Sequence, residues 1–120
     1  EGVQGAEITG VVAKEAPDTP TNVATTNHDV TYKRVTWDAV NANGASITAY
    51  TVQIEDSGST MQTVTCQNDE VTDGFCDVLI TDLTGTLILT GGNSVTAQVS
   101  ATNSEGTSAY SATGSGATIC

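Results

Sequence analysis

Hydrophobic and polar residues alternate along most of the chain, in short stretches separated by turn residues. Alternation with a period of two is typical of strands that bury one face of a sheet. Helix-forming residues are scarce, so the sequence predicts an all-β protein without helices. The expected strands cover residues 22–27, 30–40, 46–56, 61–66, 76–83, 86–90, 94–103 and 107–113.

Clusters of turn-forming residues separate these stretches. Asn43 and Gly44 lie in the turn 41–45, and both residue types readily adopt the left-handed backbone that tight turns need. A regular succession of strands and turns is typical of a β-sandwich. Further turns are expected at 57–59, 91–93 and 104–106, with a polar loop at 67–75.

Composition and charge narrow the class of protein. The 120 residues allow one domain with one core. Because 14 acidic residues face only 3 basic ones, the chain is a poor partner for nucleic acid or an anionic membrane. No apolar run approaches the roughly 18 residues of a membrane span, which argues against membrane insertion. Abundant Thr and Ser with few charges indicate an extracellular β-protein, whose hydroxyls could carry O-linked sugar.

Four segments stand out in order along the chain. They read PTNV (20–23), VTWDAV (35–40), NGASITAYTVQI (43–54) and LTGGNSVTAQVSATNSEGTSAYS (89–111). Together they resemble the motifs of the fibronectin type III family. The resemblance implies an immunoglobulin-like β-sandwich of seven to eight strands, with an additional N-terminal strand outside the domain.

The alternation and this resemblance together assign the core. One family feature is absent: the tyrosine that ties a corner to the backbone falls at Val95, so that corner must be held in another way. Leu83 competes with Leu89 for the leucine of this motif, and Leu89 is preferred for its six-residue spacing to Val95. The expected core residues are Val35, Trp37, Ile47, Tyr50, Val52, Leu89 and Val99.

The resemblance also supports a disulfide between Cys66 and Cys76. These residues flank the polar loop, where some fibronectin-like domains of bacterial surface proteins carry a similar pair. In the chain-entropy model, closing a ring of about 11 residues stabilises a fold by roughly 2.5–3 kcal/mol. Disulfides form in oxidising compartments, so an extracellular or cell-surface location is expected. Cys120 is left over, as a free thiol, a bridge within its own chain or an intermolecular disulfide.

No residue pattern indicates catalysis, a metal or another cofactor. His28 stands in a loop without a nucleophile motif nearby, so an enzyme is not expected. The polar loop could offer calcium ligands, but its spacing matches no twelve-residue calcium loop, and a solvated loop closed by the disulfide is preferred. The acidic residues concerned are Asp69, Glu70, Asp73 and Asp77.

An alternating arm precedes the domain. Two prolines in 14–20 predict a stiff, extended linker after it, which separates an arm and linker at 1–17 from a domain at 18–120. Three roles stay open for residues 6–13: an edge strand on their own domain, the end of a preceding domain, or a strand that pairs with the next molecule. The more apolar face of the arm comprises Ala6, Ile8, Gly10 and Val12.

Pairing with the next molecule is the leading hypothesis. The last strand is rich in small residues and offers a weak edge, and head-to-tail contacts that do not close build filaments. The sequence therefore predicts a non-enzymatic, exported structural protein, a fibre subunit that self-associates into a homopolymer through its N-terminal arm. An adhesion, binding or spacer module from a larger multidomain surface protein is the alternative, with loops 41–45, 67–75 and 104–106 as contact sites.

Overall fold

The computed structural model describes residues 15–27 and 31–119, which fold into eight strands and two short helices. The strands are β1 (Ala24–Asn27), β2 (Tyr32–Thr36), β3 (Ala49–Glu55), β4 (Met61–Val64), β5 (Phe75–Leu79), β6 (Ser94–Asn103), β7 (Gly106–Thr107) and β8 (Gly114–Thr118). The helices are α1 (Glu70–Asp73) and α2 (Ile80–Gly85).

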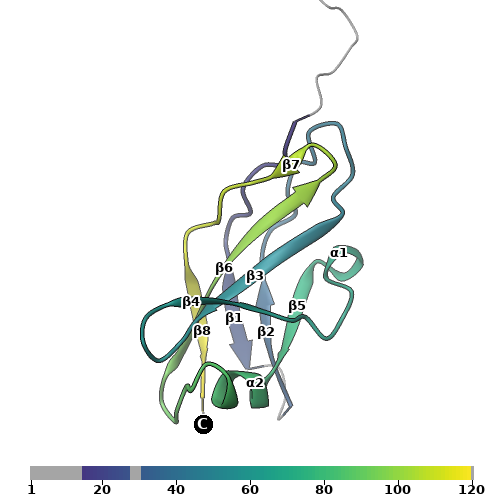
Figure 1. The fold of residues 1–120 in the computed structure, drawn as a ribbon. Helices are drawn as coiled ribbons and strands as arrows, with labels where there is room; N and C mark the ends of the chain where they lie inside the picture. The colour runs from purple at the N-terminus through teal and green to yellow at the C-terminus, as the bar shows by residue number, and fades with distance from the viewer. Residues whose placement is uncertain (1–14, 28–30, 120) are drawn as a thin grey trace, which may run out of the picture.

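The strands form two antiparallel sheets that pack face to face (Figure 1). One sheet has the order β1-β2-β5. The other has the order β4-β3-β6, and both β7 and β8 pair with the free side of β6. Register follows the alternation of side chains: Val35 lies opposite Cys76, and Val52 lies opposite Val99. The predicted all-β sandwich is therefore confirmed.

Inward-facing side chains of both sheets form one core. The rings of Trp37 and Tyr50 pack at a centroid distance of 4.9 Å, and Tyr50 is half-buried at the edge of the core. Ile47 is half-buried, just before β3 begins. Of the residues expected in the core, those that are buried are Val35, Trp37, Val52, Leu89 and Val99.

The prediction of a helix-free chain is wrong at two places. Asp69 caps α1, because its carboxylate accepts hydrogen bonds from the backbone N–H groups of Val71 and Thr72. The helix ends at Gly74, whose φ of 79° is left-handed. The sequence predicted only a polar loop at 67–75, because a four-residue helix is too short to show a helical period.

The second helix replaces the end of the strand predicted at 76–83, and the strand predicted at 86–90 does not form. β5 stops at Leu79, and α2 then turns the chain so that Leu83 becomes fully buried. Residues 86–90 pair with no strand among the described residues, although Leu87 and Leu89 are buried. Alternation alone could not separate a strand from this compact corner, since Leu87 and Leu89 are buried at the spacing of two that a strand would show.

The predicted last strand, 107–113, is also displaced. It divides into β7 and β8, and the serines between them follow β6 without strand geometry. The hydroxyl of Ser108 accepts a hydrogen bond from the N–H of Ala101, and that of Ser111 accepts one from the N–H of Val99. These hydroxyls satisfy buried N–H groups that a regular strand would pair with carbonyl oxygens.

Candidate functional site

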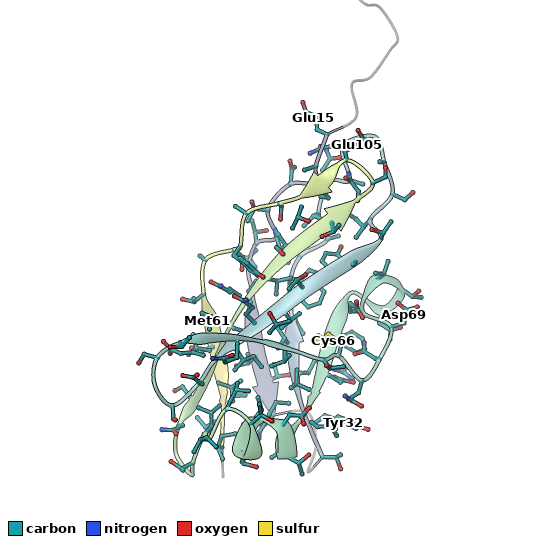
Figure 2. The ribbon with its side chains drawn as sticks, in the orientation of Figure 1. Glu15, Tyr32, Met61, Cys66, Asp69 and Glu105 are labelled. Atoms are coloured by element: carbon teal, nitrogen blue, oxygen red, sulfur yellow. A yellow bond between two sulfur atoms is a disulfide. The ribbon has the colours of Figure 1, made fainter. Side chains whose placement is uncertain are left out.

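The start of the described chain is fastened to one end of the sandwich, which we call the N-terminal pole: residues 15–18, loop 41–45 and turn 104–106. Asn103 is buried at its centre and donates hydrogen bonds from its amide to the carbonyl oxygens of Glu15 (2.7 Å) and Ala42 (2.9 Å). Its side-chain oxygen accepts from the N–H groups of Glu105 and Gly106. One side chain thus joins three segments, and Figure 2 places Glu15 and Glu105 together at this end.

A second set of bonds holds the predicted linker. The N–H of Glu15 donates to the carbonyl oxygen of Asn43 (3.1 Å), and the N–H of Asp18 donates to that of Asn41 (3.0 Å). The Asn43 amide returns a bond to the carbonyl oxygen of Ala16 (2.9 Å). Residues 15–18 are therefore hydrogen bonded to loop 41–45, and the boundary at residue 17 stays a prediction. The arm residues Ala6, Ile8, Gly10 and Val12 lie outside the described residues.

The opposite end, the C-terminal pole, comprises α2, turn 90–93 and Ile119. The side chain of Asn93 closes this turn by accepting a hydrogen bond from the N–H of Thr90 (2.8 Å). Ile119 donates its N–H to the carbonyl oxygen of Asn93 (2.9 Å) and accepts from the N–H of Gly92 (2.7 Å). The last described residue is thus anchored. Cys120 lies outside the described residues.

The Cys66–Cys76 disulfide is present, with a Cα–Cα distance of 5.0 Å, and the prediction is confirmed. It fastens the segment after β4 to the outer edge of β5. Asn68 reinforces the same junction, since its amide donates to the carbonyl oxygen of Phe75 and its oxygen accepts from the N–H of Asp77, both at 2.8 Å. Figure 2 shows Cys66 and Asp69 on this side of the sandwich.

The acidic residues of this loop act within the fold. Asp69 caps α1, and a hydrogen bond from the Thr72 hydroxyl lowers the pKa of its carboxyl below 3.8, its ordinary value. Asp77 forms a two-pronged ion pair with Arg34, at 2.8 and 3.2 Å. In the described ranges, no group of three His, Cys, Asp or Glu side chains lies in a position to hold a metal ion. His28 is outside these ranges.

Arg34 also organises the outer face of the β1-β2-β5 sheet. It lies directly opposite Asp77 in the register of β2 and β5. Its guanidinium carbon lies 3.8 Å from the centre of the Phe75 ring, the diagonal neighbour on the same face. Charge pairing and stacking together fix this long side chain, and sequence reasoning missed the pair because it depends on which strands are adjacent.

Strand edges determine where another chain could pair. β1 covers the outer side of β8: a Cβ atom at Gly116 would overlap the carbonyl oxygen of Thr25. The Thr25 hydroxyl accepts from the N–H of Ala117 (2.9 Å) and donates to the carbonyl oxygen of Val95 (2.7 Å). At these residues β1 therefore covers the side of β8 that does not pair with β6, so the weak edge expected at the last strand is not exposed there. Within the described residues, β4 ends its sheet and pairs with β3 alone.

The surface of the described residues carries shallow concavities. One of about 430 Å³ lies where residues 19–23 separate from residues 111–113, beside the seam of β1 and β8. Another of about 220 Å³ lies between the end of β4 and α2. Neither gathers a nucleophile, a base and an orienting acid, which catalysis of the triad type requires.

Solved structures share this arrangement of strands. A multidomain piece of titin matches with a TM-score of 0.66 and 21% identity, over 98% of this chain and 35% of the titin chain. A mutant of FN3tt matches with a TM-score of 0.58 and 19% identity, over 87% of this chain and 98% of that one. Domains FN1–FN3 of chicken CNTN1 match with a TM-score of 0.64 and 21% identity, over 82% of this chain and 31% of that one.

The chain has a fibronectin type III fold. It spans about a third of the titin and CNTN1 chains that it resembles. No family model and no curated protein sequence matches it. Neither helix of the described residues has the length and apolar character of a membrane span.

In this fibronectin type III fold, other contacts hold the corner that lacks the tyrosine. Val95 is fully buried at that position, and its carbonyl oxygen is bonded by the Thr25 hydroxyl from the other sheet. Asn93 fixes the adjacent turn, and Leu89 donates its N–H to the carbonyl oxygen of Leu83 (2.9 Å). Leu83 and Leu89, which competed for one position of the motif, are both buried and both pack in this corner.

Proposed function

We propose that this chain is a non-enzymatic structural module of an exported protein. It would join the neighbouring domains of the same polypeptide end to end. One observation carries the proposal: the described chain starts at the N-terminal pole and finishes at the C-terminal pole, on opposite ends of the sandwich (Figure 1). Both positions are hydrogen bonded to the body of the domain. A force applied to one end is therefore transmitted through the folded domain to the other end, and the domain keeps its two neighbours apart.

Two further observations support this proposal. The disulfide favours an oxidising compartment, and hence an extracellular or cell-surface location. The titin and CNTN1 chains that share this fold are multidomain proteins in which such a domain is one unit of several. Most polar side chains at the poles and in the disulfide loop bond the fold itself, which suits a structural role.

Sedimentation velocity of the 120-residue chain tests the proposal. We expect a monomer over a hundredfold range of concentration in reducing buffer. A Cys120→Ser variant is the control in oxidising buffer, since a dimer that it abolishes would come from the intermolecular disulfide. Polymers that persist in this variant would contradict an end-to-end module.

A fibre subunit is the second candidate, supported by the open edge of β4. Exposed edge strands accept an added strand through main-chain hydrogen bonds. An arm bearing Ala6, Ile8, Gly10 and Val12 would pair there with a neighbouring molecule, and a disulfide at Cys120 would reinforce the homopolymer. Deletion of residues 1–13 should then abolish fibres seen by electron microscopy. Fibres that survive the deletion would exclude this candidate.

O-linked glycans on exposed Thr and Ser residues belong to the same proposal. Thr21, Thr26 and Ser115 are exposed on the described surface. Intact-mass measurement of protein from its native source tests this directly, because hexose additions would raise the mass in fixed steps. A mass equal to that of the bare chain would exclude them.

A further inference from the structure

The slot that holds β8 accepts only a narrow set of residues. Gly116 has a φ of 144°, and a Cβ atom there would overlap the carbonyl oxygen of Thr25. Ala117 is fully buried and Ile119 is 6% exposed, so both fill the core between the sheets. Ser115 and Thr118 point to solvent and are unconstrained by packing. Over residues 115–119 the slot therefore favours the pattern x-Gly-Ala-x-Ile, and it also constrains Gly114 just before them.

Residues 4–8 of the arm carry this same pattern. They read QGAEI, and residues 115–119 read SGATI. Within these five residues, identity falls on Gly116, Ala117 and Ile119, and the differences fall on Ser115 and Thr118, which point to solvent. Gly5 thus corresponds to Gly116, at a spacing of 111 positions. A match at these three positions indicates a strand suited to a similar slot, with Val3 at the place of Gly114 as the exception.

We propose that residues 4–8 are a β8-type strand whose place is the β8 slot of a second domain of this kind, which precedes this domain in a tandem array. The proposal rests on the end-to-end role proposed above and names the partner: another copy of the fold. Since β8 is the last strand of the domain, a strand of this type at the start of the chain follows the preceding copy. Residues 9–14 then connect the two domains.

The match also defines how the partner differs from this domain. Val3 stands where β8 has Gly114, and a Cβ atom at Gly114 would overlap the carbonyl oxygen of Val23. The preceding domain must leave more room beside the counterpart of Val23. A test within this sequence therefore keeps Gly114 and exchanges only the residues that follow it.

A tandem protein provides this test. It joins Gly114 of one complete copy directly to Gln4 of the next, so that residues 4–8 take the place of residues 115–119 in the first copy. Limited proteolysis, with fragments identified by mass, reports which copy is folded. We expect both copies to resist the protease as well as the single 120-residue chain does, and to give native cross-peaks in a ¹⁵N–¹H correlation spectrum.

Two control proteins make the result specific. A tandem that retains residues 115–119 before residue 9 should be folded in both copies. Gly5→Val at the junction should raise the cleavage rate of the first copy about tenfold or more, because cleavage follows the population of the open state. The same substitution in the single chain should leave cleavage within residues 15–119 unchanged.

The proposal is overturned if the first copy is digested in the test tandem. This holds even if the control tandem is also digested, because the proposal requires residues 9–14 to be a sufficient connection between the two domains. It is equally overturned if Gly5→Val has no effect at the junction. Failure of the end-to-end role would appear instead as polymers of the single chain in sedimentation. The two failures are therefore distinguishable.

Discussion

The side chain of Asn103 donates a 2.7 Å hydrogen bond to the carbonyl oxygen of Glu15, across 88 positions of sequence. This bond joins the end of the longest strand, β6, to the first described residue. Two further carbonyl oxygens, of Ala42 and Ala45, accept from the same amide. One buried side chain therefore joins the segments of the N-terminal pole, in addition to the hydrogen bonds between residues 15–18 and loop 41–45.

Asn103→Ala should reduce the free energy of unfolding by at least about 2 kcal/mol, because it leaves several buried backbone groups without partners. Urea unfolding followed by the fluorescence of Trp37 measures this change. Ser104→Ala is the matched control: this neighbour is exposed and bonds only Glu105, so its effect should stay within about 0.5 kcal/mol. Equal effects of the two substitutions would contradict the role of Asn103.

The seam between β1 and β8 should tolerate no side chain at Gly116. Gly116→Ala is expected to cost more than about 2 kcal/mol, since the added carbon overlaps the backbone of Thr25 and the φ is positive. Gly92→Ala separates the two effects: its φ of 88° is positive, but no atom lies within 4 Å of the added carbon. About 1 kcal/mol is expected there. A Gly116→Ala cost no larger than that of Gly92→Ala would show that β1 can move away.

Removal of the disulfide should destabilise the domain without unfolding it. A Cys66→Ala, Cys76→Ala double variant should lose about 2.5–3 kcal/mol, the loop-closure entropy of this ring. Denaturant midpoints with and without a reducing agent measure the loss, and the variant itself should be insensitive to the reducing agent. A loss below about 1 kcal/mol would mean that the hydrogen bonds of Asn68 hold this loop alone.

Two exposed carboxylates should titrate at unusually low pH. The pKa of Asp56 is lowered by hydrogen bonds from the N–H of Thr60, from the side chain of Gln62 and from the N–H of Gly58. The Thr72 hydroxyl, followed by its N–H, lowers the pKa of Asp69. Carboxyl ¹³C titration should give both midpoints below 3.8. Midpoints at or above that value would contradict these bonds.

The sign of the effect on stability follows from these pKa values. Both groups have a lower pKa in the folded state than in the unfolded state, so their contribution is fully present above the unfolded value near 3.8. It is lost as the pH falls through the folded value. Asp56→Asn should therefore flatten the acid limb of the stability curve and leave the curve above pH 5 parallel to that of the wild type.

Several elements could be predicted because they depend on short patterns. Apolar and polar residues alternate along most of β6, and the predicted bounds agree with the structure. The disulfide followed from the family resemblance together with the position of both cysteines around one loop. The corner after β5 could not be predicted, because Leu87 and Leu89 are buried at a spacing of two, as in a strand, although they follow α2 in an irregular segment.

The sequence by itself determined the two-sheet sandwich, because a period of two fixes which side chains must be buried, whichever strands are neighbours. It also contained, in QGAEI and SGATI, a repetition whose meaning depended on the slot. Only the tertiary structure decided which edges are open, since the closure of β8 depends on the approach of Thr25 from a distant strand. Long-range packing of this kind leaves in the sequence only glycines and small residues, which look the same in a weak edge and in a tightly closed seam.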